Sequence, residues 1–183
     1  MVLPGFMSND QATWALRRFL TSLGYSVSPW KLGINRGPML PLLETVRERL
    51  EQEGEPTHLV GWSRGGIIAR ETARDLPHLV HSVITMGTPV HGGLNATSIR
   101  SVVQRDTGIT PESVRQLMRE RQHRPIETKI TALYSRTDGV VAWRACIDHD
   151  SPNVTHIAVS SSHSGMGHHA RVFQLIARTL ARS

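Results

Sequence analysis

The chain has 183 residues, 39% of them hydrophobic, which is enough to bury a core within one domain spanning residues 1–183. Its single cysteine, Cys146, excludes an intramolecular disulfide. The net charge of +6 comes mostly from scattered arginines at spacings expected on solvated helix faces, without a nucleic-acid-binding motif or interleaved aromatic residues, so we expect no nucleic-acid partner.

The sequence carries no recognisable targeting or membrane-spanning segment. Its first ten residues, MVLPGFMSND, lack the charged region and the long apolar region of a secretory signal peptide. Apolar stretches stay well below the ~18 residues that cross a bilayer. We therefore expect a cytoplasmic protein with no transmembrane segment, or a secreted one if an N-terminal segment is missing. Contact with a lipid surface would be transient.

The first part of the chain alternates short apolar runs with longer segments of helical periodicity. Residues 1–3 predict a short strand, and apolar residues at steps of three and four predict a helix over 11–23. Gly24 should end that helix. Residues 26–30 predict a second strand, and a second amphipathic helix follows from Leu40 and closes near Gly54.

The same alternation continues to the end of the chain. Four more strands are expected, at 57–62, towards the end of 79–86, at 130–134 and at 154–159, with helices over 64–76 and 172–180. Strands alternating with helices favour a parallel sheet covered by helices. We predict an α/β fold with three layers, a mostly parallel sheet of about six strands and helices on both faces.

Residues 87–127 interrupt this pattern. The segment is polar, rich in turn-forming residues and carries one or two weak helices. It is too long for an ordinary connection, so we expect either a small cap or a mobile insertion within the domain.

A serine between two glycines follows the strand expected at 57–62, in the sequence HLVGWSRGGIIAR. Apolar residues precede Ser63 and a helical pattern follows it, which is the strand, sharp turn and helix of a nucleophile elbow. Gly61 and Gly65 would leave the space that such a crowded turn needs. The alternative is a glycine-rich turn whose serine has no chemical role.

A serine nucleophile needs a base, and the base needs an acid to orient it. Asp138 lies just past one later strand and His163 just past the next, in the order of an α/β hydrolase. Asp138 could instead form an ordinary turn before Gly139. His168 competes with His163 as the base.

Two further groups of polar side chains are not expected to form a functional site. His168 and His169 are adjacent in the chain and do not predict a metal site, because neighbouring residues at a helix start do not converge on one ion. Asp148 and Asp150 lie in a polar stretch, CIDHDSPN, that we interpret as a solvated loop.

The loop Leu3-Pro4-Gly5-Phe6 follows the first strand. In the hydrolase arrangement this loop provides one backbone N–H of an oxyanion hole, and the residue after the serine provides the other. That assigns the two donors to the amides of Phe6 and Arg64. The alternative for this loop is a simple turn that ends the strand.

Taken together, these motifs resemble small lipases and esterases of the α/β-hydrolase fold. The resemblance spans nearly the whole chain, through VLPGF, HLVGWSRGG, VITMGTPVHGG, ALYSRTDGVV and SSHSGMG. It is closest to the minimal bacterial lipases that lack the first two strands of the full fold. In those proteins the catalytic histidine precedes a small residue, glycine and an apolar residue, as His163 does here, so the resemblance favours His163.

The resemblance implies a serine hydrolase of lipid metabolism that cleaves carboxylic esters through a Ser63-His163-Asp138 triad and an acyl-enzyme. It implies a small-molecule ester or lipid as substrate and no cofactor or metal ion. The alternatives are an acyltransferase or thioesterase that uses the same triad, and a non-catalytic binding protein with the same fold.

Overall fold

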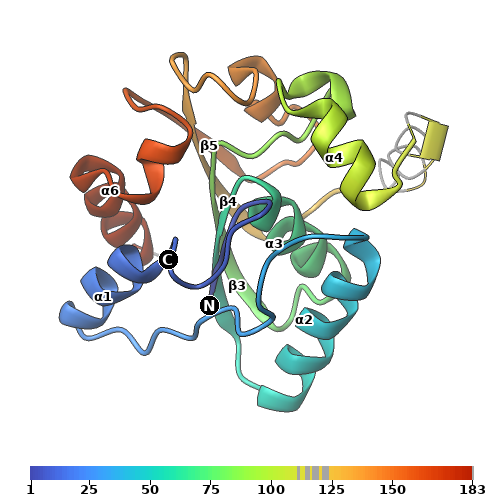
Figure 1. Ribbon diagram of the computed structural model, residues 1–183. Coiled ribbons are helices and arrows are strands. Elements are labelled where there is room, and N and C mark those ends of the chain that lie inside the picture. The colour runs from blue at the N-terminus through green and yellow to red at the C-terminus, as the bar shows by residue number, and fades with distance from the viewer. Residues whose placement is uncertain (111, 114–115, 117–119, 121–123, 183) are drawn as a thin grey trace.

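The computed structural model describes residues 1–110, 112–113, 116, 120 and 124–182. Its centre is a five-stranded sheet in which every pair of neighbouring strands is parallel (Figure 1). The strands lie in chain order: β1 (Val2–Leu3), β2 (Thr57–Trp62), β3 (Val80–Met86), β4 (Lys129–Ser135) and β5 (Val154–Val159). The expected fold class is therefore confirmed.

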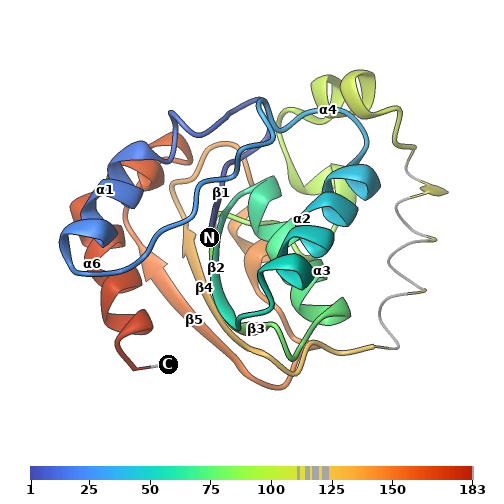
Figure 2. The ribbon, with the colours of Figure 1, turned by 90° about the horizontal axis from the view of Figure 1, so that it is seen from below.

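Helices cover both faces of this sheet, as Figure 2 shows. α1 (Trp14–Ser22) and α6 (Ala170–Leu180) lie together on one face, and α2 (Met39–Glu53) and α3 (Arg64–Asp75) cover the other. Each face has its own cluster of buried apolar side chains. The two clusters explain why the central strands are apolar almost throughout, since parallel strands between helix layers are buried on both sides.

The helix ends follow the local sequence. α2 ends at Gly54, whose φ of 66° is left-handed and suits glycine, and α1 ends just before Gly24, whose φ is 92°. α1 begins at Trp14, three residues later than expected, because residues 10–13 form turns. The periodicity of apolar residues thus located the helices but placed the start of one of them too early.

The strand expected at 26–30 does not form. One backbone bond joins this segment to the free edge of the sheet, from the Val2 N–H to the Ser28 carbonyl at 3.0 Å. β1 offers only two residues for pairing, and Pro29 has no N–H to donate. Lys31 then turns the chain away with a φ of 62°. The segment therefore makes no ladder of backbone hydrogen bonds with the sheet.

The insertion expected at 87–127 is described in part. It contains the short 3₁₀ helix η1 (Gly93–Ala96) and the helix α4 (Arg100–Thr107). A single antiparallel bridge joins Thr97 to Val141, which ties its first part to the loop after β4. The segment expected as a small cap or mobile insertion also includes residues 111, 114–115, 117–119 and 121–123, which lie outside the described residues.

Among the described residues, no helix is long and apolar enough to cross a membrane.

The burial of the core predicts how leucine substitutions affect the free energy of unfolding. Leu59 in β2 is fully buried, whereas Leu40 in the first turn of α2 is 57% exposed. Leu59→Ala should lower the free energy of unfolding by about 3 kcal/mol, because it removes buried methyl groups and leaves a cavity. Leu40→Ala, the same chemical change at an exposed site, should shift it by less than about 0.5 kcal/mol. Urea denaturation measures both, and equal effects would contradict the assigned core.

Candidate active site

The carboxyl ends of all five strands lie at one edge of the sheet, because the strands are parallel. Ser63 directly follows β2, and Gly87 directly follows β3. Asp138 lies three residues past the end of β4, and His163 lies four residues past the end of β5. The topology therefore gathers residues that are far apart in the sequence at a single edge.

Ser63 is held in a strained backbone conformation between β2 and α3. Its φ is 53° and its ψ is −120°, a combination that residues with side chains rarely adopt. The Ser63 N–H donates to the Met86 carbonyl at 2.8 Å, and the Ser63 carbonyl accepts from Thr88 Oγ1 at 3.0 Å. These bonds to the end of the neighbouring strand fix the strained turn.

The glycines around Ser63 are required by close backbone approaches. A Cβ on Gly61 would lie 2.4 Å from the Cα of Gly66, and a Cβ on Gly65 would lie 2.4 Å from the Leu3 carbonyl oxygen. Both distances are far below van der Waals contact, so neither position admits a side chain. The roles predicted for Gly61 and Gly65 from the sequence agree with this geometry.

Asp138 and His163 form a buried pair. Asp138 Oδ2 lies 2.8 Å from His163 Nδ1, and the two residues are 5% and 8% exposed. Asp138 Oδ1 accepts the backbone N–H groups of Val140 and Val141 at 2.9 and 2.6 Å. One Asp138 oxygen therefore shapes the turn before Gly139, and the other meets the imidazole.

Gly87 is a site residue that sequence reasoning missed. Its φ is 54°, and a Cβ there would lie 2.9 Å from Asp138 Oδ2 and 3.0 Å from His163 Nδ1. Gly87 follows Met86, whose carbonyl accepts the Ser63 N–H, so it lies between the serine and the pair. The available signal was a glycine directly after an apolar strand, in the sequence ITMGTP.

The imidazole of His163 also lies beside the elbow. Its ring centre is 5.8 Å from that of Trp62, the residue before Ser63. Within the described part of the chain, no hydrogen bond joins Ser63 Oγ to His163; contacts between a nucleophile and its base are often loose without substrate. His168 is exposed at the end of the short helix η3 (Ser164–Gly167), and Asp138 pairs with His163 instead.

The two expected oxyanion donors, the amides of Phe6 and Arg64, belong to segments that adjoin Ser63. A Cβ on Gly5 would be 3.5 Å from the Cβ of Ser63, so the loop that carries Phe6 lies against the serine. Arg64 is the first residue of α3, where a backbone N–H has no acceptor within the helix. The Phe6 N–H likewise has no acceptor among the residues that the structure describes.

Cys146 lies close to this site but is not a competing nucleophile. Burial, reinforced by the negative charge of Asp138, raises the pKa of its thiol to about 12. The thiolate is the reactive form of cysteine, and at neutral pH this thiol stays protonated.

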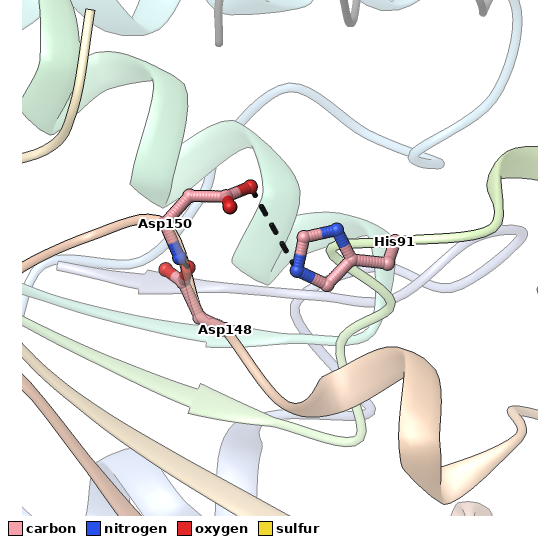
Figure 3. Close-up of side chains that lie close together, drawn as sticks. All are labelled: His91, Asp148 and Asp150. Carbon is pink, nitrogen blue, oxygen red and sulfur yellow. Dashed lines mark hydrogen bonds and ion pairs between the residues drawn. The ribbon is translucent and has the colours of Figure 1, made fainter.

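A second cluster, drawn in Figure 3, consists of His91, Asp148 and Asp150, whose potential ligand atoms all lie within 4.8 Å of one another. His91 Nε2 is 3.9 Å from Asp150 Oδ2. Asp148 is already committed, because Oδ2 meets Arg70 Nη2 at 2.5 Å and Oδ1 accepts two backbone N–H groups. A divalent cation would also lie beside the Arg70 guanidinium, so these donors suit a structural ion pair better than a metal ion.

This pair corrects the expectation for Asp148 and includes one buried arginine. Asp148 is 5% exposed, whereas its polar neighbourhood suggested a solvated loop, and Arg70 is 6% exposed although most arginines were expected on solvated faces. Burial raises the pKa of the Asp148 carboxyl, but the charge and hydrogen bond of Arg70, with hydrogen bonds from Ser151 and the Asp150 backbone, outweigh it and lower the pKa to about 2. Asp150 does lie in the solvated part of the loop.

Comparisons with known proteins establish similarity at the level of the fold. No family model and no curated protein matches the sequence. Among solved structures, an α/β hydrolase from the metagenome of Mar Chica lagoon sediments in Morocco has a TM-score of 0.73 at 17% identity, covering 99% of this chain and 89% of that chain.

Two further structures give similar values. A mature lipase of Bacillus licheniformis has a TM-score of 0.69 at 17% identity and covers 98% of this chain and 90% of its own. The mouse α/β hydrolase domain-containing protein 10 has a TM-score of 0.67 at 19% identity, with 99% and 87% covered. At such identities the likeness establishes the fold and leaves the reaction open.

The crowding at the elbow predicts an asymmetry between two glycines. Gly61→Ala should lower the free energy of unfolding by about 3 kcal/mol, because the new Cβ must push the backbone of α3 away from β2. Gly167→Ala is the control, since its Cβ would meet nothing closer than 3.6 Å. Thermal and urea unfolding measure both variants. A tolerated Gly61→Ala would show that β2 and α3 do not approach as closely as described.

The Arg70–Asp148 pair predicts a pH-dependent contribution to stability. Asp148→Asn should destabilise the protein at pH 7 by about 3 kcal/mol, because it leaves the buried Arg70 without a countercharge. Since the folded pKa of Asp148, about 2, lies below the ordinary value of 3.8, this contribution is present above pH 3.8 and falls as the pH drops towards 2. Urea denaturation between pH 7 and 3 measures the difference in the free energy of unfolding between the wild type and Asp148→Asn, which should become smaller as the pH falls. Asp150→Asn should neither destabilise the protein at pH 7 nor change the pH dependence of its stability. An equal loss of stability in Asp150→Asn would contradict the assignment of Asp148 as the partner of Arg70.

Proposed function

We propose that this protein, whose fold is that of the α/β hydrolases, is a serine hydrolase that cleaves carboxylic esters through an acyl-enzyme. The buried Asp138–His163 pair beside the strained Ser63 turn carries this proposal. A serine exposed by an elbow, a histidine next to it and a carboxylate on the far nitrogen of that histidine are the three parts that acyl transfer needs.

In the proposed reaction Ser63 Oγ attacks the ester carbonyl carbon while its proton passes to His163 Nε2. The carbonyl oxygen becomes an oxyanion that accepts hydrogen bonds from the backbone N–H groups of Phe6 and Arg64. As the tetrahedral intermediate collapses, the bond to the alcohol oxygen breaks and the alcohol takes the proton from His163. Throughout, Asp138 accepts a hydrogen bond from the Nδ1–H of the imidazole, remains ionised and stabilises the positive charge of the ring.

The second half of the reaction repeats these roles with water. A water molecule attacks the acyl carbon of the Ser63 ester and gives one proton to His163 Nε2. Collapse of the second intermediate breaks the bond to Ser63 Oγ, which recovers the proton and releases the carboxylic acid. The residues that perform both halves all belong to this chain, and each lies in a loop after a strand or, for Arg64, at the start of a helix.

Apolar side chains near the site favour an ester with an apolar acyl group. Met7, next to Phe6, is 49% exposed, and Ile34 in the adjoining loop is 47% exposed. The Met7 N–H donates to the carbonyl of Asn35, so these two segments lie side by side. Val102 on α4 is also 47% exposed. Exposed apolar groups of this kind suit contact with an acyl chain or a lipid surface.

Activity measurements test the proposal. Turnover of p-nitrophenyl esters of increasing acyl length should be present in the wild type and should fall at least about 10⁴-fold in Ser63→Ala and His163→Ala. Ser63→Ala removes the oxygen that attacks the ester, and His163→Ala removes the nitrogen that takes the proton from Ser63.

His168→Ala is the matched control, because His168 is exposed and not paired with Asp138, and it should keep wild-type turnover. Unchanged hydrolysis in Ser63→Ala, or a wild type that hydrolyses no ester, would refute the proposed function. Loss of turnover in His168→Ala with retention in His163→Ala would move the base to His168.

A further inference from the structure

The loop that carries Phe6 is held from one side by a single buried residue. Asn35 is fully buried, and its Nδ2 donates to the Pro4 carbonyl at 2.8 Å. Its backbone carbonyl accepts the Met7 N–H at 2.9 Å, and its own N–H donates to the Ser8 carbonyl at 2.8 Å. Asn35 thus forms three hydrogen bonds with this loop. One is to Pro4, before Phe6, and two are to Met7 and Ser8, after it.

Gly37, two residues further along, joins this segment to both α3 and α4. Its N–H donates to Asp106 Oδ2 on α4 at 2.6 Å, and its carbonyl accepts from Arg64 Nη2 at 2.6 Å. Its φ of 70° is left-handed and suits glycine, and its N–H and its carbonyl belong to the two successive peptide units that meet at this residue. The Arg64 side chain is thus linked to α4 through one residue.

The Arg64 guanidinium is buried and also contacts Phe6. The residue is 8% exposed, and its Cζ lies 5.6 Å from the centre of the Phe6 ring. Burial lowers the pKa of the guanidinium, while the charge of Asp106 raises it. A buried cation depends on a nearby anion, so Asp106 compensates the charge that packs over Phe6.

Asp106 is itself well placed for this role. Its side chain is 8% exposed, and Oδ1 pairs with Arg36 Nη2 at 2.8 Å. The hydrogen bond from the Gly37 N–H, helped by the charge of Arg36, holds the pKa of the carboxyl below its ordinary value, so the group is ionised at neutral pH. Arg36 is 59% exposed in its side chain and adds less than the buried partners.

We propose that Asp106 is a positioning residue for the oxyanion hole, acting through Gly37 and the Arg64 side chain on the backbone amides of Phe6 and Arg64. This inference rests on the proposed function, because it concerns the transition state of ester cleavage. It gives α4, a helix of the insertion after β3, a role in the rate of the reaction without any contact to the reacting atoms.

The network predicts a loss of rate without a matching loss of substrate binding. Asp106→Asn keeps the shape of the side chain but removes the charge that Arg64 requires, so the two amides should move relative to each other. Removal of one oxyanion donor typically costs about 10²–10³ in kcat, and displacement of a donor should cost less, about tenfold. KM should stay within about twofold, because an interaction made only in the transition state is lost.

A trifluoromethyl ketone that matches the best ester adds a readout that a purely structural role would not change. Its adduct with Ser63 carries an oxyanion, so its Ki should rise in Asp106→Asn by the same factor by which kcat falls. Arg105→Gln, an exposed charge change at the preceding position of α4, should leave kcat, KM and Ki at wild-type values. Thermal unfolding shows whether each variant is folded at the assay temperature.

A double-mutant cycle tests whether Asp106 acts through Arg64. Arg64→Met keeps the backbone amide and the apolar stem but removes the guanidinium, and it should lower kcat by about the same tenfold. If the two residues act in one network, the double variant should be no slower than either single variant. A loss equal to the product of the two single losses would overturn the coupling.

The outcomes separate this inference from the function on which it rests. A wild type without esterase activity refutes the proposed function and the positioning role together. An active wild type whose kcat and Ki are equal in Asp106→Asn and Arg105→Gln refutes the positioning role alone. Should Asp106→Asn fail to fold, Arg64→Met carries the same readouts, and unchanged kcat and Ki in that variant would overturn the proposal.

Discussion

The strained backbone at Ser63 is the constraint on which the rest of the site depends. A positive φ at a residue with a side chain is unfavourable by about 1–3 kcal/mol and persists only where the surroundings fix it. Here β1 meets α3 through Gly65, β2 meets α3 through Gly61, and the end of β3 accepts the Ser63 N–H. Three strands and one helix therefore meet at the short turn that contains Ser63. Their close packing projects the side chain of Ser63 beyond the edge of the sheet.

The remaining parts of the site are arranged around this turn by strand order alone. Each strand lies beside its neighbour in sequence, so the loops after β3, β4 and β5 succeed one another along the edge. Gly87, Asp138 and His163 therefore lie in successive loops along this edge, after β3, β4 and β5. His163 reaches back over Gly87 because that position has no side chain to block the imidazole. The absence of a side chain at Gly87 thus allows the contact between Asp138 and His163.

The sequence was sufficient to predict the layers, most of the helices and the residues at the edge, because periodicity and short motifs are local signals. It was insufficient where a contact depends on the fold. Asn35 and Asp106 act on backbone groups of distant segments, and such contacts leave no pattern among neighbouring residues. The failed strand at 26–30 has strand-like residues but lacks a partner long enough to pair with it. Asp148 has polar neighbours in sequence, yet its buried partner comes from α3.

The divided contacts of Asp138 have a consequence for any substitution at that position. One oxygen accepts two backbone N–H groups and the other accepts from the imidazole, so the side chain must present acceptors in both directions. An asparagine that keeps its oxygen on the backbone would turn its NH₂ group towards His163 Nδ1. That nitrogen would then have to accept, which moves the ring proton to Nε2, the atom that must be free in the proposed reaction, where it acts as the base. A neutral amide of the same size would thus preserve the loop while selecting the wrong tautomer of the histidine.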